Sequence, residues 1–259
     1  MQCQKIIEKI EEMYPLSYAL EWDNSGFLAG RHQKEVERIY VALDATEEVI
    51  EAAVKDGADL LITHHPMLFS PIRHVTDQDF TGRRLLRLIQ QDIVYYAMHT
   101  NYDVLRMSEL SANHLGLIDQ EILETTCETP CQQGIGRIAD LAEPVELKKY
   151  CETVKESFDL SAVQVFGDLG RRVKRVAVSP GSGKSMIGPA LEKGADLLVT
   201  GDIGHHEGID AAAQGMCIID AGHYGIEHIF VEDMSRFLAQ TFETVTVTAD
   251  QPRPPFSVL

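Results

Sequence analysis

Two segments of this chain repeat a single pattern. Residues 38–63 read RIYVALDATEEVIEAAVKDGADLLIT and align without a gap to residues 175–200, RVAVSPGSGKSMIGPALEKGADLLVT, at a constant offset of 137. Ten of the 26 aligned positions are identical, including the run Gly-Ala-Asp-Leu-Leu at 57–61 and 194–198. Each copy has an apolar run, a helical pattern and a second apolar run, which predicts strand, helix and strand. We therefore expect an α/β fold with two related halves.

The rest of the chain continues this alternation, which is typical of parallel sheets with right-handed crossovers. In the first half we expect helices at 3–13, 80–91 and from about 107, and a strand at 93–97. In the second half we expect helices at 144–157 and 225–240, and strands at 162–166, 173–178, 216–220 and 243–248.

A domain junction is predicted at residues 127–140, because Pro130, Gly134 and Gly136 interrupt the pattern there. This junction gives domains at 1–126 and 127–259. The segment 222–248 would be able to pack back on the first domain.

Composition limits the function classes. The formal net charge is −17, from 23 basic and 40 acidic side chains, which argues against a continuous basic surface for nucleic acid. No window approaches 18 consecutive apolar residues, so we expect no membrane span. The five cysteines lack the density of a disulfide framework, and the amphipathic start of the chain does not resemble a signal peptide. These features predict a cytoplasmic protein.

Three polar clusters follow apolar strands, and in open α/β sheets the carboxyl ends of strands carry the sites. They are Thr63-His64-His65-Pro66, the segment from His99 to Asp103, and the segment from His223 to Glu227. The last two share an H-x-x-x-acid spacing, which places His223 and Glu227 one turn apart if the segment is helical. Imidazole and carboxylate ligands favour zinc, ferrous iron or manganese.

Each cluster also has a structural interpretation. A single histidine at a strand end is more often a hydrogen-bonded structural residue, and His223 with Glu227 could be a surface helix pair. Metal binding is favoured because three such clusters follow apolar strands, the first of which belongs to the repeat. Adjacent imidazoles on a turning backbone point apart, so His64 and His65 could serve two different metal ions.

Two other motifs are weaker. The loop Pro180-Gly181-Ser182-Gly183-Lys184-Ser185 resembles the end of a phosphate-binding loop, but valine occupies position 178, where the first glycine is required. The loop is either a strand-to-helix turn or a cradle for an anionic group of a substrate. Cys127 and Cys131 are spaced C-x-x-x-C, yet no second cysteine pair accompanies them as a metal or redox motif requires.

As a set, the motifs resemble the YbgI or NIF-three-like family of dinuclear-metal proteins, some of which are named GTP cyclohydrolase 1 type 2 homologs. The resemblance covers essentially the whole length, through WDNSG at 22–26, THHP at 63–66, HTNYD at 99–103, TGDIGHH at 200–206 and GHYGIE at 222–227. It implies that the metal ligands are His64, His65, Asp103, His223 and Glu227. Five such ligands are too many for one ordinary site, so we expect two divalent ions per chain. It also implies two α/β domains with the metal site in the cleft between them, and a ring-shaped homohexamer.

The leading functional hypothesis is a metal-dependent hydrolase or cyclohydrolase. His99 is the candidate catalytic residue, because it lies one turn from Asp103 if that segment is helical and an unperturbed imidazole titrates near neutral pH. A supporting role for His99 beside the metals is the alternative. His205 and His206 could line the pocket, and Asp202 could orient a ligand histidine.

The rival class uses the same ligands without catalysis: a metal-binding scaffold, a metal chaperone or a regulatory interaction protein. A nucleotide substrate is suggested only by the family name. For the phosphates of such a substrate, Lys184 and Arg73 are the candidate cations.

Overall fold

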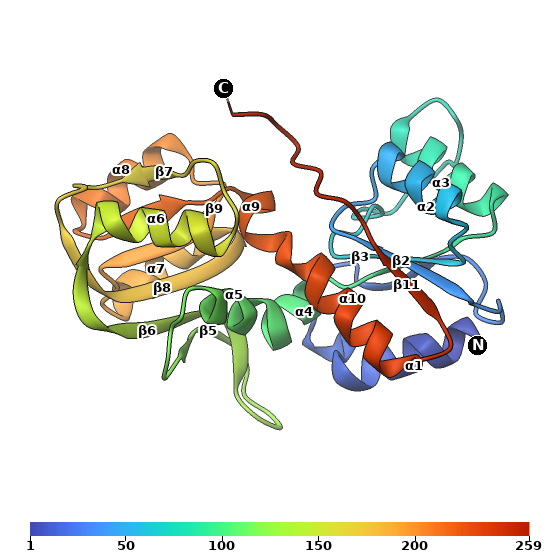
Figure 1. Ribbon diagram of the computed structural model, residues 1–259, viewed down its shortest axis with the longest axis horizontal. Coiled ribbons are helices and arrows are strands. Elements are labelled where there is room, and N and C mark those ends of the chain that lie inside the picture. Colours follow the sequence, from blue (N-terminus) through green and yellow to red (C-terminus); the bar gives the residue numbers. More distant parts are fainter. Residues whose placement is uncertain (259) are drawn as a thin grey trace. The chain divides into compact units, whose positions relative to one another are not determined.

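The computed structural model describes residues 1–258 and divides them into two compact units (Figure 1). The first unit comprises Met1–Tyr102 and Phe230–Pro252, and the second comprises Asp103–Ile229 and the chain from Arg253 onward. Each unit contains one β-sheet with helices packed on it. The chain therefore has a mixed α/β fold with two sheets.

The first unit has a five-stranded sheet in the order β1-β4-β3-β2-β11. β1 runs antiparallel to β4 and the other neighbours are parallel. The strands are β1 (Gly26–Ala29), β2 (Arg38–Ala42), β3 (Leu60–Thr63), β4 (Val94–Ala97) and β11 (Thr246–Ala249). The helices are α1 (Cys3–Met13), α2 (Glu47–Asp56), α3 (Phe80–Gln90), α4 (Thr100–Tyr102) and α10 (Ile229–Thr241), with a 3-10 turn at Leu16–Tyr18.

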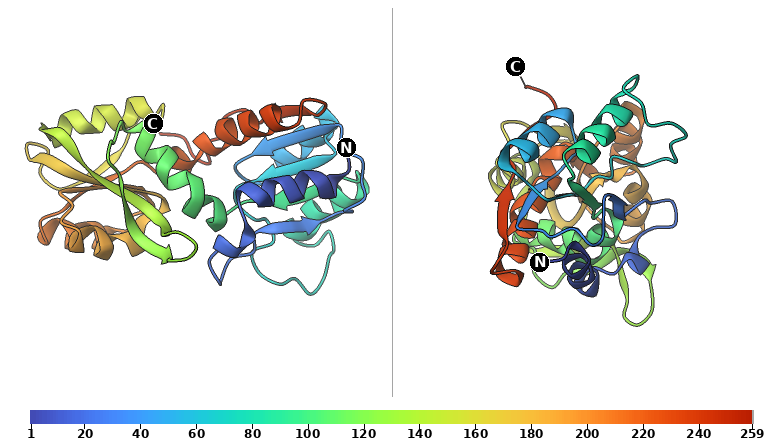
Figure 2. Two further views of the ribbon diagram at one scale, coloured as in Figure 1. Left: turned by 90° about the horizontal axis from the view of Figure 1, so that it is seen from below. Right: turned by 90° about the vertical axis from the view of Figure 1, so that its right-hand side faces the viewer.

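Helices cover both faces of this sheet. α2 and α3 lie on one face, and α1 and α10 lie on the other (Figures 1 and 2). The core under α2 and α3 combines Ile50 and Leu88 with alternate strand residues such as Leu61 and Tyr95. β3 and β4 are buried along their whole length, as expected of strands in a parallel sheet covered on both faces.

The second unit has a six-stranded sheet in the order β5-β6-β8-β9-β10-β7. β8, β9 and β10 are parallel, and the other neighbours are antiparallel. The strands are β5 (Glu121–Cys127), β6 (Gln133–Glu146), β7 (Gln164–Phe166), β8 (Arg172–Ser182), β9 (Leu197–Gly201) and β10 (Cys217–Asp220). The helices are α5 (Ser108–His114), α6 (Leu147–Ser157), α7 (Ile187–Glu192), α8 (His205–Ala213) and α9 (His223–Glu227), with a π-helical turn at Asp103–Met107 and a 3-10 turn at Gly183–Met186.

Both repeated segments form strand, helix and strand, as predicted, and their details match at the offset of 137. Ile39 pairs with Leu60 in the first unit, and the equivalent Val176 pairs with Leu197 in the second. In both segments a glycine with positive φ, 75° at Gly57 and 71° at Gly194, follows the helix.

The aspartate of each Gly-Ala-Asp-Leu-Leu run explains part of the repeat. Asp59 accepts hydrogen bonds from the backbone amides of residues 37 and 38, at 2.8 and 3.1 Å. Asp196 accepts from the amides of residues 174 and 175, at 2.9 and 3.0 Å. Each carboxylate thus joins the start of one strand to the start of the next. The same local sequence therefore fixes the same strand pairing in both units.

Two regions differ from the sequence-based expectation. The division between the units falls after Tyr102, whereas the sequence predicted a boundary after residue 126. Residues 127–140, expected as the junction, instead form the turn and much of the second strand of the β5–β6 hairpin inside the second unit. Gly136 has a φ of 72°, and an added Cβ would lie 2.9 Å from Leu123 side-chain atoms. A glycine is therefore required at this position for the two strands of the hairpin to pack together. Strands β1 and β5 were not expected.

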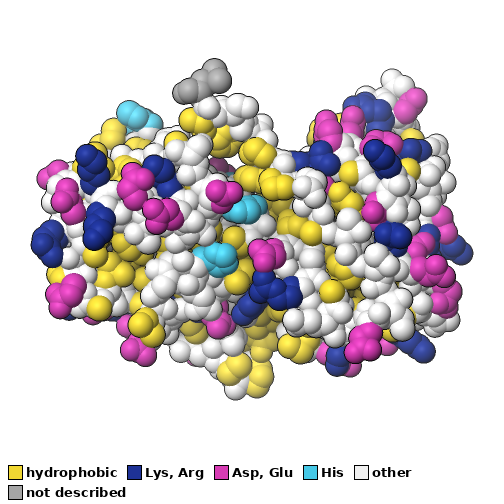
Figure 3. All heavy atoms as spheres, in the orientation of Figure 1, with side chains coloured by type: hydrophobic (Ala, Val, Ile, Leu, Met, Phe, Trp, Pro, Cys, Tyr) yellow, Lys and Arg dark blue, Asp and Glu magenta, His cyan; other side chains and the backbone are white. Residues whose placement is uncertain are grey.

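The chain returns to the first unit near its end. α10 and β11 both belong to that unit, and β11 pairs in parallel with β2 at its edge. In the described part of the chain, no helix combines the length and apolar character that a bilayer crossing needs. Figure 3 shows basic side chains interspersed with acidic ones on the face drawn.

We predict that Asp59→Ala and Asp196→Ala each lower the free energy of unfolding of their own unit by about 1–3 kcal/mol, because two backbone amides lose their acceptor in each variant. Urea denaturation, followed by a probe in each unit, measures the effect. Glu192→Ala, at an exposed position on α7, is the matched control and should leave stability unchanged. Wild-type stability of both aspartate variants would contradict this account of the repeat.

Candidate metal centre

Three histidines gather at one edge of the sheet in the first unit. His64 and His65 directly follow β3, and His99 follows the neighbouring strand β4. Thr63 and Ala97, near the ends of these strands, are paired in the parallel register, so the residues that follow emerge side by side. One ring nitrogen from each of the three imidazoles lies within 4.8 Å of the others, a spacing at which they could hold a metal ion.

Each of these imidazoles is held through its Nδ1 atom by an oxygen. The Nδ1 of His64 lies 2.7 Å from the carbonyl oxygen of Met98. The Nδ1 of His65 lies 2.7 Å from a carboxylate oxygen of Asp44, and that of His99 lies 2.7 Å from one of Asp23. A carbonyl or an ionised carboxylate only accepts hydrogen bonds, so Nδ1 is the donor in all three. In the neutral form of each imidazole, the lone pair that can bind a metal is therefore on Nε2.

The turn that carries His64 and His65 is held by Tyr95 of β4. Its hydroxyl group donates to the carbonyl oxygen of His65 at 3.0 Å and accepts from the amide of Met67 at 2.8 Å. It also lies 2.9 Å from the hydroxyl of Thr63. Burial raises the pKa of Tyr95 to about 12, so the phenol remains protonated at neutral pH. The two adjacent histidines are thus fixed on a rigid turn.

Asp23 anchors His99 and is itself strongly hydrogen-bonded. Its side chain is fully buried and accepts from His99, from the Ser25 hydroxyl at 2.6 Å and from the Thr100 amide at 3.0 Å. Burial alone raises the pKa of Asp23, but the hydrogen bonds from His99, Ser25 and Thr100 outweigh it and hold the pKa well below its usual range. Asp23 is therefore ionised at neutral pH and fixes the orientation of His99.

The second unit carries a smaller cluster on α9. The Nε2 atom of His223 lies 3.0 Å from a carboxylate oxygen of Glu227, one turn later on the same helix. The Nδ1 atom of His223 lies 2.8 Å from a carboxylate oxygen of Asp202, which confirms the predicted contact between an aspartate and a ligand-type histidine. His223 is thus anchored in the same way as the three histidines of the first unit.

Glycines make room for this cluster. A Cβ on Gly181 would lie 2.6 Å from Oε1 of Glu227, and Gly181 has a φ of 72°. A Cβ on Gly201 would lie 2.5 Å from the amide nitrogen of His223. The glycine of the loop at 180–185 that lies nearest to α9 therefore admits the His223–Glu227 pair. Lys184 of this loop forms an ion pair with Glu207, so its charge is matched within the unit.

Asp103 opens the π-helical turn at Asp103–Met107, which continues into α5. The hydroxyl of Ser108 donates to its carbonyl oxygen at 2.9 Å. A single π-helical turn inside a helix is often found at functional sites, because it redirects the side chains around it. His99 and Asp103 are joined by α4, the short helical segment Thr100–Tyr102.

Sequence reasoning missed the residues that anchor the histidines. Asp23 was noted only as part of a motif, and Asp44 was not noted at all. A signal existed for Asp44, since it directly follows the first apolar run of the repeat and is replaced by Gly181 in the second copy. The Met98 carbonyl has no sequence signal. His205 and His206 are exposed at the start of α8, with ring centroids 5.2 Å apart.

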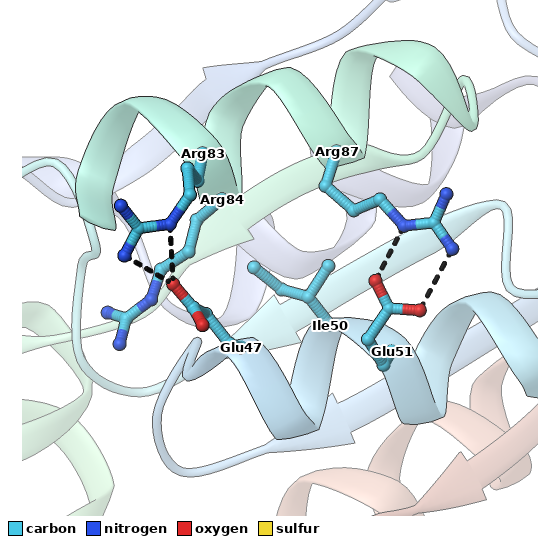
Figure 4. A pocket seen from close by; sticks show the side chains of 6 residues that line it. All are labelled: Glu47, Ile50, Glu51, Arg83, Arg84 and Arg87. Atoms are coloured by element: carbon cyan, nitrogen blue, oxygen red, sulfur yellow. Dashed lines mark hydrogen bonds and ion pairs between the residues drawn. The ribbon is translucent and has the colours of Figure 1, made fainter. Parts of the chain in front are cut away.

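A separate hollow of about 260 Å³ lies between α2 and α3 (Figure 4). Its arginines are largely matched by glutamates: Arg83 pairs with Glu47 at 3.1 Å and Arg87 with Glu51 at 2.6 Å. The Arg84 guanidinium lies 5.0 Å from the centre of the Phe80 ring. These contacts join two surface helices, so we interpret the hollow as a structural feature.

We predict that Asp23→Asn lowers the free energy of unfolding by about 1–3 kcal/mol, because an amide NH₂ would face groups that donate to the carboxylate. The pKa of Asp23 is lowered on folding, so its contribution is complete above about pH 4 and is lost as the pH falls toward the folded pKa. Thermal unfolding across pH 2–8 should show a difference between wild type and variant that is constant above about pH 4 and shrinks below it. Asp77→Asn, in an exposed loop, is the control, and a difference independent of pH would contradict the prediction.

Comparisons with known sequences and with solved structures point to the same family. A protein of Streptococcus pneumoniae named GTP cyclohydrolase 1 type 2 homolog is 34% identical over 246 residues, covering 93% of this chain and 91% of that protein. One of the same name from Clostridium acetobutylicum is 33% identical over 231 residues, covering 88% and 86%. The structure of a Bacillus cereus protein related to NIF3 matches with a TM-score of 0.93 at 26% identity, covering 100% of this chain and 99% of that one.

The model of the Duf34/NIF3 (NGG1p interacting factor 3) family matches residues 1–254, nearly the whole chain. Together with the close agreement in fold and the shared names of the relatives, this match establishes the relationship. The chain belongs to the Duf34/NIF3 family.

Proposed function

We propose that this chain is a dinuclear metal-binding protein that acts as a metal-dependent hydrolase. The proposed ligands of two divalent ions are His64, His65, Asp103, His223 and Glu227. The observation that carries the proposal is the anchoring of each of these histidines at Nδ1 by an oxygen acceptor. Metal-binding histidines are commonly held in this way, because the hydrogen bond fixes the ring and directs Nε2 to the metal.

The donor set fits first-row transition metals. Three imidazoles and two carboxylates suit zinc, iron or manganese, and no thiolate belongs to the set. His64 and Glu227 are buried, and a buried carboxylate is costly unless a cation or hydrogen bonds compensate its charge. Binding a divalent cation at Glu227 would provide such compensation.

Chain connectivity supports a joint site. Tyr102 and Phe230 of the first unit both contact the His64 ring, with centroid distances of 6.1 and 5.2 Å. Asp103 directly follows Tyr102, and Glu227 precedes Phe230 by three residues, a reach of at most about 11 Å. The two carboxylates of the second unit are therefore tethered close to residues that contact His64. We propose that they complete the site with the histidines of the first unit.

We also propose that the two units arose by internal duplication. The identical strand register and the equivalent aspartate hydrogen bonds at the offset of 137 support this origin. In this proposal each copy contributes ligands from the ends of its strands, and the metals lie in a cleft between the copies.

Bound metals would lower the pKa of a coordinated water and polarise the bond under attack. His99 would act beside them as the proton carrier. Its Nδ1 donates to the ionised Asp23, which fixes the ring and holds Nε2 toward the cluster. His99 can thus accept a proton at Nε2 and return it to a leaving group.

A metal chaperone or scaffold is the second candidate. His223 is 35% exposed, whereas His64 is 0% exposed. A metal held partly by an exposed ligand can exchange with solvent or a partner more readily than a fully enclosed one. A chaperone that delivers metal would use the same five ligands as a hydrolase. Only a measurement of substrate turnover distinguishes the two functions.

A nucleotide remains the proposed substrate class, because relatives bear the name GTP cyclohydrolase 1 type 2 homolog. Of the two cations considered for its phosphates, Lys184 is paired with Glu207, which leaves Arg73 on the exposed loop after β3. A ring-shaped homohexamer is likewise proposed and can be measured by light scattering.

We predict that Glu227→Gln lowers metal content from about two ions per chain to one or none, because a charged ligand is lost without a change in volume. The measurement is elemental analysis after reconstitution with manganese, iron or zinc, with circular dichroism to confirm folding. Glu243→Gln, at an exposed position after α10, is the matched control. Full occupancy in Glu227→Gln would remove Glu227 from the site.

For catalysis, we predict that His99→Ala lowers turnover by roughly 10²-fold to 10⁴-fold while metal content stays near two per chain. Turnover of nucleotides by the metal-loaded protein, screened by product chromatography, gives the reference. Loss of metal from His99→Ala would make His99 a ligand instead. If the loaded wild type turns over no nucleotide, the chaperone or scaffold becomes the better account.

A further inference from the structure

Two large aromatic side chains are exposed beside the histidines of the first unit. Trp22 is 57% exposed and Phe69 is 50% exposed. Their ring centres lie 5.8 Å apart with an interplanar angle of 46°, so the rings contact each other. Exposed apolar surface made of paired aromatic rings is a common feature of binding sites.

Both rings are held by the loops that carry them. The Asp23 amide donates to the Leu20 carbonyl at 2.9 Å, which closes a turn around Trp22. The Leu20 amide donates to the Thr100 hydroxyl at 2.9 Å. The side-chain amide of Asn24 donates to the carbonyl oxygen of Leu68, next to Phe69, and so ties the two loops together. The binding of a ligand to these rings would therefore involve only a small loss of side-chain and loop conformational entropy.

The aromatic pair also borders His99. The His99 ring centre lies 5.9 Å from that of Trp22 and 6.4 Å from that of Phe69, with interplanar angles of 74° and 76°. Trp22 precedes Asp23, the residue that holds His99. A flat molecule lying on the indole would thus meet the imidazole at its edge.

We propose that Trp22 and Phe69 form a stacking surface for a planar heteroaromatic ring, such as a nucleobase, and place it beside His99. The proposal rests on the proposed function for the role of His99, and it defines the part of the substrate that the protein recognises. Stacking does not require a positive surface, so it operates in a chain with a net charge of −17. Two rings are also far smaller than the roughly 800 Å² per partner of a stable protein interface.

Trp22 is the only tryptophan in the sequence, so tryptophan fluorescence reports on this surface alone. The experiment uses full-length protein stripped of metal by a chelator that is then removed, with excitation at the red edge of tryptophan absorption. Guanosine monophosphate and adenosine monophosphate should quench the emission in a saturable manner, after correction with free tryptophan. Ribose 5-phosphate, which lacks the ring, should not quench it.

Substitutions test whether each of the two rings contributes to nucleotide binding. Phe69→Leu should weaken nucleotide binding roughly threefold to tenfold, because one stacking contact is lost. Phe80→Leu removes another exposed phenylalanine of the first unit, on α3, and should leave the affinity unchanged. The Trp22→Leu variant has no tryptophan fluorescence, so its binding is measured by equilibrium dialysis. It should bind the nucleotides at least tenfold more weakly than the wild type.

Three results would overturn the proposal: no saturable quenching by either nucleotide, equal binding of ribose 5-phosphate, or an unchanged affinity in Phe69→Leu. An emission spectrum that shifts on dilution, without any response to nucleotides, would assign the surface to contact with a second copy of the chain. The assay needs neither metal nor turnover. Quenching without hydrolysis would retain the stacking surface and reject the hydrolase, whereas hydrolysis without quenching would do the reverse.

Discussion

The arrangement of the candidate site depends on one constraint, which is the hydrogen bond from Nδ1 of each histidine to a fixed oxygen. In the first unit the acceptors are a backbone carbonyl and two carboxylates, and in the second unit the acceptor is Asp202. Each bond selects one tautomer and one ring orientation, so Nε2 is the nitrogen whose lone pair could bind a metal or a proton. The sheet makes this possible, because β3 and β4 are parallel and in register and therefore end together.

Much of the fold could be predicted because the signals are local. The repeated Gly-Ala-Asp-Leu-Leu run encodes a helix end, a strand start and an aspartate that binds the preceding strand, and both copies adopt the same structure. The apolar strands that precede His64 and His99 were also evident, and hence the histidine cluster at their ends. These predictions needed only residues close together in the sequence, where periodicity and turn chemistry are informative.

The remaining features depend on distant contacts. Asp23 reaches His99 across 76 residues, and Asp44 reaches His65 across 21, so neither pairing has a local pattern. The glycines at 134 and 136 suggested a junction, but they admit the close approach of neighbouring strands in a hairpin. Gly181 suggested a phosphate loop, yet it makes room for Glu227. For these glycines, the residue type indicated an unusual backbone conformation or a close neighbour. Which neighbour lies there could be seen only in the tertiary structure.

Our central proposal is that the anchored histidines present Nε2 to two metal ions together with two carboxylates. The most direct measurement is a crystal structure of protein loaded with manganese or zinc, with anomalous scattering recorded on both sides of the metal absorption edge. The account predicts two anomalous peaks, with metal bonds to Nε2 of His64, His65 and His223 and to the carboxylates of Asp103 and Glu227. Metal bonded through Nδ1, or located away from these residues, would contradict it.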